Sequence, residues 1–239
     1  MRERAEVQRL FVAESVGVSF HGKQILKSAS VWASPGEVSV LLGRNGSGKT
    51  TLFRAATGLV SRDFGTVQFK GETYEKPTLH GLSRLGLFYL PDNGLLSRRR
   101  TLAWHLKVLR DRFPGEALDG FPEGVEGEYL LEKTVWEMSG GEERRAELAL
   151  AWARNPVCLL ADEPLAGIAP KDQEVVARVI RSMADEGCAV VITGHDVRPL
   201  MGLADRIVWM VAGTTHGIGS PDEAQAHEQF RREYLGPGF

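Results

Sequence analysis

The sequence predicts an α/β fold in which a largely parallel sheet is covered by helices on both faces, with an antiparallel β layer before it and a short helical insertion. An apolar run at residues 38–42 leads through a glycine-rich loop into a helical stretch. Strand-like and helical stretches alternate over residues 142–211, as they do in parallel sheets that are buried on both sides. A chain of 239 residues, 43% of them hydrophobic, is long enough for one such domain with an appended subdomain.

The first elements belong to the antiparallel layer. Residues 10–20 and 25–32 combine β-branched and aromatic side chains around a His-Gly turn, so they predict two antiparallel strands. A Pro-Gly turn then leads into the strand 38–42 and the helix that begins near Lys49. The later predicted elements are a strand at 66–70, a short helix at 78–85, a strand at 86–90, helical pieces at 101–112 and 128–135, a helix at 142–154, a strand at 157–161, a helix at 171–186, and strands at 188–193 and 206–211.

Residues 91–138 differ in composition from the rest of the chain. Their two helical pieces are separated by a loop rich in proline, glycine and acidic residues, FPGEALDGFPEGVEGE. This pattern predicts a small helical subdomain inserted into a single domain that spans residues 1–239. Residues 1–90 and 139–239 then form the β layer and the sheet core.

The loop after the strand 38–42 reads GRNGSGKTT. Its glycines permit positive φ, so the backbone N–H groups can turn inward and bind oxygen anions at the positive end of the following helix. Lys49 would reach the β and γ phosphates of a nucleotide, and the Thr50 hydroxyl would ligate Mg²⁺. The alternative is a chance glycine-rich turn, which a buried strand in front of the loop makes rare. The pattern therefore predicts a nucleotide-binding P-loop made of Gly43, Arg44, Asn45, Gly46, Ser47, Gly48, Lys49, Thr50 and Thr51.

A second buried strand, at 157–161, delivers two adjacent carboxylates to its carboxyl end, where ligand sites of α/β sheets form. Asp162 would bind Mg²⁺, and Glu163 would orient or deprotonate an attacking water molecule. The alternative is that both side chains simply cap the next helix. The P-loop earlier in the chain favours the catalytic interpretation.

The stretch MSGGE at residues 138–142 is a second candidate anion site, because a serine followed by two glycines at a helix start presents free backbone N–H groups. By itself it could be only a helix cap. Together with the P-loop and the two carboxylates, it resembles the ATP-binding-cassette (ABC) ATPases, whose signature reads LSGGQ. The resemblance covers almost the whole chain and implies a P-loop NTPase fold with a RecA-like sheet core. It also implies that Ser139, Gly140, Gly141 and Glu142 cap the γ-phosphate bound by an opposing subunit.

The same resemblance implies roles for two further residues. Phe20 lies where the family's aromatic side chain stacks on adenine; the alternative is a core aromatic at the end of a strand. His195 follows the strand 188–193 and matches the switch histidine that contacts the γ-phosphate. The expected catalytic residues are thus Lys49, Glu163 and His195.

As a member of this family, the chain would be an ATPase that uses ATP and Mg²⁺. Two such chains, identical or different, would form a head-to-tail dimer that drives transport through a separate transmembrane permease docked on the helical subdomain. The stretch EPLAGIAP at 163–170 and the closing YLG at 234–236 look most like the ATPases of branched-chain amino acid importers and of the lipopolysaccharide exporter. Two alternatives are a soluble ABC ATPase without a transport role and a regulatory subunit that binds nucleotide but hydrolyses little.

Three features depart from the family's pattern. Asp92 stands where the family has a glutamine that touches Mg²⁺ and communicates with the membrane subunit; a carboxylate can still ligate Mg²⁺, but it adds negative charge beside a triphosphate. Ala169 replaces an aspartate that makes a contact across the dimer. The helical subdomain is short by about one helix, and its RRR run at 98–100 could meet an acidic partner or lipid headgroups, or simply face solvent.

Bulk composition limits the remaining possibilities. A formal net charge of −2 gives no support for nucleic acid as a partner. No apolar stretch approaches the length needed to span a bilayer, and the N-terminal residues lack the apolar segment of a signal peptide. Cys158 and Cys188 have no metal-ligand spacing and are expected to be free thiols in a reducing compartment. We therefore expect a cytoplasmic protein that is peripheral at the inner face of the membrane.

Overall fold

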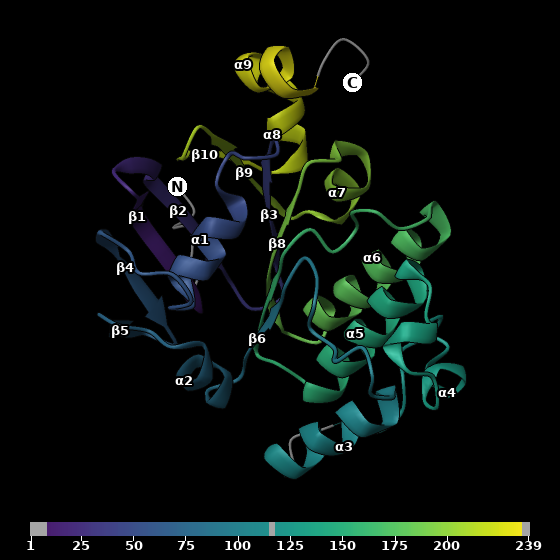
Figure 1. Ribbon diagram of the computed structural model, residues 1–239. Coiled ribbons are helices and arrows are strands. Elements are labelled where there is room, and N and C mark those ends of the chain that lie inside the picture. Colours follow the sequence, from purple (N-terminus) through teal and green to yellow (C-terminus); the bar gives the residue numbers. More distant parts are fainter. Residues whose placement is uncertain (1–8, 115–117, 236–239) are drawn as a thin grey trace, which may run out of the picture.

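The computed structural model describes residues 9–114 and 118–235. Within them the chain forms a ten-stranded sheet with the order β5-β4-β1-β2-β10-β9-β3-β8-β7-β6 (Figure 1). The strands are β1 (Phe11–Phe20), β2 (Lys23–Ala33), β3 (Val38–Gly43), β4 (Phe64–Phe69), β5 (Glu72–Tyr74), β6 (Leu87–Leu90), β7 (Cys158–Ala161), β8 (Ala189–Gly194), β9 (Arg206–Val211) and β10 (Thr214–Gly219). The helices are α1 (Lys49–Ala56), α2 (Leu79–Arg84), α3 (Leu102–Arg112), α4 (Gly127–Leu130), α5 (Gly140–Arg154), α6 (Pro170–Asp185), α7 (Val197–Leu203), α8 (Pro221–Ala226) and α9 (Glu228–Phe230). Two short turns, η1 (Val135–Glu137) and η2 (Arg231–Leu235), complete the description.

The sheet has an antiparallel part and a parallel part, as the sequence predicts. Strand β1 pairs antiparallel with β2 and β4. Strand β3 pairs parallel with β8 and β9, and β7 pairs parallel with β6 and β8. Because parallel strands end at the same edge, the loops that follow β3, β7 and β8 leave the sheet side by side.

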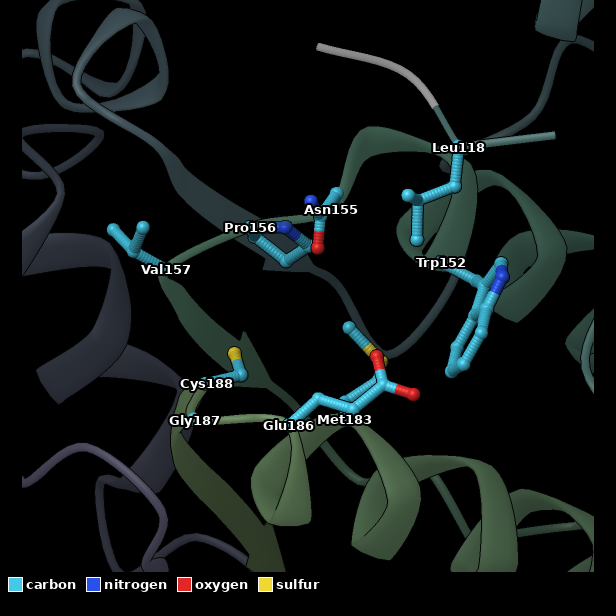
Figure 2. A pocket seen from close by; sticks show the side chains of 9 residues that line it. All are labelled: Leu118, Trp152, Asn155, Pro156, Val157, Met183, Glu186, Gly187 and Cys188. Atoms are coloured by element: carbon cyan, nitrogen blue, oxygen red, sulfur yellow. The ribbon is translucent and has the colours of Figure 1, made fainter.

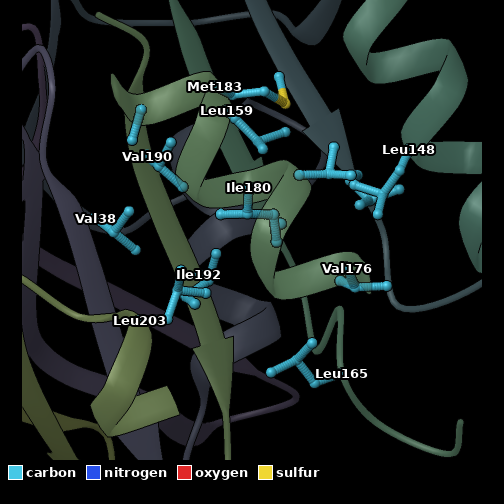
Figure 3. Close-up of a cluster of buried hydrophobic side chains, with 14 of the residues drawn as sticks. Val38, Leu148, Leu159, Leu165, Val176, Ile180, Met183, Val190, Ile192 and Leu203 are labelled. Carbon is cyan, nitrogen blue, oxygen red and sulfur yellow. The ribbon is translucent and has the colours of Figure 1, made fainter. Parts of the chain in front are cut away.

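Helices bury both faces of the parallel part. Strand β3 shows the alternation directly, because Val38, Val40 and Leu42 pack in one hydrophobic cluster and Leu41 packs in the other. Figure 3 shows the first cluster, where Val190 and Ile192 of β8 meet side chains of α6. The second cluster contains apolar residues of α1 and of the antiparallel strands. Each fully buried aliphatic side chain contributes about 1.5–3 kcal/mol through removal of apolar surface from water.

The structure differs from the sequence prediction most clearly around residues 128–135. Instead of one helix over this range, the chain forms the single turn α4, Gly127–Leu130, and then the 3₁₀ turn η1. Glu126 has a left-handed backbone conformation, φ 57°, and a capping box between Thr134 and Glu137 starts a new turn. The prediction of a longer helix here was wrong because α4 ends at Leu130 and the capping box at Thr134 starts a separate turn.

Several elements near the C-terminus were not predicted. They are the helix α7, the strand β10 and the helical segment from α8 to η2. Strand β10 reads TTHGIG and carries two glycines, so it lacks the apolar alternation that marks the other strands. It is held by antiparallel pairing with β9, a contact that the residues of β10 do not reveal by themselves.

A buried ion pair on α5 holds the segment that follows β6. Arg144 donates hydrogen bonds to the carbonyl oxygens of Pro91 at 3.1 Å and Asp92 at 2.7 Å. Its guanidinium also lies 2.9 Å from the carboxylate of Glu147, which is only 2% exposed. Burial raises the pKa of Glu147 to about 7, which outweighs the lowering effect of Arg144.

Replacing Glu147 with glutamine is expected to change how stability depends on pH. The folded pKa of about 7 lies above the value of 4.5 for an unburied glutamate, so the folded chain holds this proton more tightly than the unfolded chain does. In the parent, tighter binding of this proton stabilises the fold below pH 4.5. Roughly 3 kcal/mol of this stabilisation is lost as the pH rises from 4.5 through 7. Relative to the parent, Glu147→Gln should gain stability over that interval in urea unfolding experiments. A difference between variant and parent that stays constant with pH would contradict this.

Candidate functional site

A pocket of about 670 Å³ opens at the carboxyl ends of β3, β7 and β8, within the size range of small-molecule sites. The structure brings many of the predicted site residues together there. The residues that line it are Ile25, Asn45, Gly46, Gly48, Lys49, Thr50, Thr51, Asp92, Glu163, Ala166, Gly167 and His195.

The glycine-rich loop has the conformation that an anion site needs. Gly46 and Gly48 have φ values of 80° and 112°, in the region that favours glycine. A Cβ atom at Gly48 would lie 2.6 Å from Leu26 Cδ2, so any side chain there would also clash. Helix α1 begins directly after Gly48 and has no side-chain cap, which leaves its first backbone N–H groups available to an anion.

Three side chains form a chain of contacts across the pocket. Lys49 is 5% exposed; its Nζ lies 3.0 Å from Glu163 Oε1 and donates to the carbonyl oxygen of Gly43 at 2.8 Å. The other oxygen of Glu163, Oε2, lies 2.8 Å from His195 Nδ1. Glu163 has a left-handed backbone conformation with φ 50°, which is uncommon outside glycine and is often found at functional sites. Glu163 thus stands between the lysine of the loop and the histidine of the next strand end.

Asp162 is buried beneath this chain of contacts. Its Oδ1 accepts a hydrogen bond from Thr193 Oγ1 at 2.6 Å, and the same Thr193 oxygen accepts from the backbone N–H of Glu163 at 2.9 Å. Burial raises the pKa of Asp162, while Thr193 and Thr50 oppose the rise. The second oxygen, Oδ2, has no hydrogen-bond partner among the described residues. A buried, unpartnered carboxylate oxygen near a threonine hydroxyl fits the ligand chemistry of Mg²⁺.

The second candidate anion site begins helix α5. The Ser139 hydroxyl accepts from the backbone N–H of Glu142 at 3.3 Å, and the Glu142 carboxylate accepts from the N–H of Ser139 at 2.8 Å. Lys133, 2.6 Å from Glu142, lowers the pKa of that carboxyl to about 2, and the Ser139 N–H adds to the effect. A Cβ atom at Gly140 would meet nothing within 4 Å, so this surface is open. Ser139, Gly140, Gly141 and Glu142 do not line the pocket at the P-loop.

The other predicted residues lie in different places. Asp92 and Thr51 line the pocket, whereas Arg44 and Ser47 line a neighbouring pocket of about 470 Å³ behind the loop. Phe20 is 43% exposed at the end of β1 and is not among the lining residues of either pocket. The apolar lining next to the P-loop comes instead from Ile25.

Sequence reasoning missed Ile25 and Thr193. Thr193 could have been found, because it ends a buried strand two residues before His195, in the position where a hydroxyl can reach the end of the adjacent strand. Ile25 carries no local signal for a binding role. Gly236, named above in the closing YLG, lies outside the described residues.

Another cavity, of about 240 Å³, lies at the amino ends of β7 and β8 (Figure 2). Val157 and Cys188, which directly precede β7 and β8, are part of its lining. Glu186 is the one acidic residue of this lining, and Cys188 is the one other lining residue with a titratable side chain. Both cysteines are buried and free, and burial raises the pKa of each thiol, to about 12 for Cys188. This cavity lacks the converging polar groups that the first pocket has.

Comparison with known proteins identifies the family. Residues 26–166 match the sequence profile of the ABC transporter family. The chain belongs to this family. It is 31% identical over 237 residues to the lipopolysaccharide export system ATP-binding protein LptB of Haemophilus influenzae, which covers 96% of this chain and 98% of that protein. It is 32% identical over 234 residues to LptB of Escherichia coli K12, with 95% and 97% covered.

Solved structures confirm the fold of this ABC protein. The ADP-bound form of MJ1267, an ATP-binding cassette of an ABC transporter, superimposes with a TM-score of 0.81 at 21% identity, covering 96% of this chain and all of that chain. The predicted P-loop NTPase fold and membership in the ABC ATPases are thereby confirmed, and the chain is an ATP-binding, ATP-hydrolysing subunit of this transporter family. In residues 9–114 and 118–235, none of the helices is both long and apolar enough to span a bilayer.

Replacing Thr193 with valine is expected to destabilise this ABC ATPase. The substitution keeps the shape but removes the hydroxyl that bonds both Asp162 and the backbone of Glu163. Loss of a buried hydrogen bond to a charged group lowers the free energy of unfolding by about 2 kcal/mol. Thr193→Ser keeps the hydroxyl and should lose less than about 1 kcal/mol, the value of one buried methyl group. Equal losses in urea unfolding of the two variants would contradict this account.

Proposed function

We propose that the chain works as a head-to-tail dimer in which two Mg-ATP molecules are each bound between the P-loop pocket of one subunit and the Ser139 surface of the other. One observation supports the proposal: the chain has two helix starts that could bind an anion, and the Ser139 segment does not line the pocket that contains Lys49. A single nucleotide site needs only one such segment on its own chain. The second is accounted for if it completes the site of a partner.

Within one subunit, the triphosphate would lie on the backbone N–H groups of residues 43–51, with Lys49 at the β and γ phosphates. Phe20, which lies at the end of β1 outside the pocket lining, would meet the adenine ring together with Ile25. Thr50, Asp162 and Asp92 are the residues that would hold Mg²⁺, directly or through water. When bound, Mg²⁺ neutralises charge on the β and γ oxygens.

Glu163 would act as the base or as the group that orients the attacking water. In the structure it is paired with Lys49 at 3.0 Å, so Lys49 must leave Glu163 when it turns to the phosphates. The freed carboxylate then accepts a proton as the water oxygen bonds to the γ-phosphorus and the bond to the leaving ADP oxygen breaks. His195, 2.8 Å from Glu163, would stabilise the transferring group on its other side.

The partner subunit would supply the rest of the charge stabilisation. Ser139, Gly140 and Gly141 present the exposed start of α5, a helix of 15 residues, to the γ-phosphate across the dimer. Glu142 is engaged with Lys133 and the N–H of Ser139, so it would hold the shape of this cap and stand beside the phosphate. Both sites would open and close together with the dimer.

The helical region would receive a transmembrane permease. Arg98, Arg99 and Arg100 are exposed there, and Trp104 is 41% exposed with its ring 5.0 Å from the Arg100 guanidinium. Arg144 links this region to the pocket, because it holds the backbone of Asp92 from helix α5. Docking of the permease at the helical region would therefore change the position of Asp92. The subunit would act at the inner face of the membrane.

Steady-state Mg²⁺-ATPase activity across a range of chain concentrations tests the proposal. Composite sites require two subunits, so activity should rise more than in proportion to concentration until the dimer is saturated. Specific activity that does not depend on concentration, with a monomer in solution, would contradict the composite site.

Glu163→Gln is expected to abolish turnover while an ATP-bound dimer persists. The amide keeps the shape but cannot accept the proton from water, and loss of a positioned base costs roughly 10²–10⁴-fold in rate. The rate is measured in single-turnover experiments and the dimer by size-exclusion chromatography with ATP. Turnover equal to that of the parent would remove Glu163 from the mechanism.

Asp92→Asn is expected to raise the affinity for ATP when the metal is chelated. Asp92 lines the pocket, so its negative charge opposes a triphosphate that no cation neutralises. Removing one like charge at this range is worth about 1 kcal/mol, or roughly five-fold in affinity. Titration of a fluorescent ATP analogue in EDTA measures it, and with Mg²⁺ the gain should shrink or reverse. An unchanged affinity in EDTA would place the Asp92 charge away from the phosphates.

A further inference from the structure

The C-terminal segment, defined here as α9 together with η2, packs behind the P-loop. Phe230 is fully buried and its ring stacks on that of Tyr234, with centroids 5.4 Å apart and planes at 21°. Both rings lie against Trp209 of β9, at 5.5 Å and 6.5 Å. The segment is therefore anchored to the sheet by an aromatic cluster, and the position of Tyr234 is determined by packing.

Polar contacts join this segment to the backbone of the nucleotide site. Arg44 of the P-loop donates from Nη2 to the carbonyl oxygen of Glu233 at 3.0 Å. The Tyr234 hydroxyl donates to the carbonyl oxygen of His195 at 3.2 Å. Burial raises the pKa of this hydroxyl to about 12, although the backbone of Gly43 opposes the rise. The hydroxyl thus connects the C-terminal segment to the residue that follows β8.

These contacts lie next to the ends of strands β3 and β8. The parallel ladder between β3 and β8 ends at the pair Leu42 and Gly194. The next residue of β3, Gly43, pairs with Met210 of β9, and His195 follows the end of β8. The Tyr234 hydroxyl reaches the backbone of His195 just beyond the last pair, and Arg44, which follows β3, holds the same C-terminal segment through Glu233. The carbonyl of Gly43 is the acceptor of Lys49 Nζ.

His195 needs such support because its side chain has few contacts with the described residues. The side chain is 45% exposed, and within residues 9–114 and 118–235 its one hydrogen bond goes to Glu163, the residue that would change partners during turnover. A backbone anchor that does not involve Glu163 would keep the imidazole in place throughout. Tyr234 itself is outside the pocket lining, in the wall of the neighbouring pocket behind the loop, and it reaches the nucleotide site only through the backbone of His195.

We propose that Tyr234 is a positioning residue for ATP hydrolysis: its hydroxyl ties the backbone of His195 to the packed C-terminal segment and so holds the imidazole at the γ-phosphate position. The inference rests on the proposed roles of His195 and Glu163. It assigns to the C-terminal segment a function in the chemical step, separate from binding of the nucleotide.

Tyr234→Phe tests the hydroxyl alone, because the phenyl ring keeps its stacking on Phe230. We expect kcat to fall roughly five- to twenty-fold, since misplacing a catalytic group costs rate, while the KM for ATP stays within about two-fold. Tyr74→Phe is the matched control, because Tyr74 lies in β5 at the far edge of the sheet and should leave both values unchanged. A parent-like kcat in Tyr234→Phe, or an equal fall in the control, would overturn the inference.

A double-mutant cycle with His195→Ala shows whether Tyr234 acts through His195. If it does, Tyr234→Phe should cause no further loss of single-turnover rate in the His195→Ala chain, although it costs five-fold or more in the parent. A loss of the same size in both backgrounds would mean that Tyr234 acts elsewhere and would overturn the inference.

Hydrogen exchange gives a readout that does not depend on activity. In Tyr234→Phe the amides of residues 194–197 should exchange faster than in the parent and in Tyr74→Phe, because the backbone anchor is lost. Unchanged exchange would overturn the inference. A parent chain without ATPase activity would contradict the proposed function instead, and the exchange experiment would still decide the role of the Tyr234 hydroxyl.

Discussion

The parallel pairing of β3, β7 and β8 is the constraint on which the site depends. In this register Leu42 lies beside Gly194, and Ala161 lies beside Ile192. The strands therefore end at one level, and the residues that follow them in sequence become neighbours in space. A phosphate-binding loop, a pair of carboxylates and a histidine, which are far apart in the chain, meet for this reason alone. A shift of one residue in any of the three strands would separate the contacts between Lys49, Glu163 and His195.

Charge balance explains how this edge of the sheet can be stable and reactive. Lys49 and Asp162 are both buried, which is costly for isolated charges. Lys49 is compensated by Glu163 and by the carbonyl of Gly43, whereas Asp162 has Thr193 on one oxygen and no described partner on the other. One oxygen of the buried Asp162 therefore lacks a positively charged partner, and the Lys49 ammonium can exchange Glu163 for a phosphate. Both properties favour binding of a metal-bound polyphosphate.

Two buried arginines connect this edge to the helical side of the molecule. Arg144 holds the backbone after β6, and Arg145 lies 3.1 Å from Asp172 at the start of α6. A Cβ at Gly141 would collide with the Asp172 carboxylate, so α5 and α6 approach closely just behind the Ser139 surface. The surface proposed to meet a partner's nucleotide, the segment with Asp92 and the first turn of α6 are thus joined by contacts through α5. Through Arg144 these contacts extend to the backbone of Asp92, which lines the pocket.

The sequence by itself determined the α/β class, the P-loop, the carboxylate pair after a buried strand and the family, because these depend on local spacing and on the periodicity of apolar residues. It did not determine the extent of the helix predicted at 128–135, where α4 ends after one turn and a capping box at Thr134 starts another. Only the tertiary structure showed that Tyr234 reaches His195 and that Arg44 reaches Glu233, contacts that join residues 39 and 189 positions apart. Only the tertiary structure showed, in the same way, that Ile25 lines the pocket and that Phe20 does not. Such contacts follow from how distant elements pack, and no local pattern in the chain encodes them.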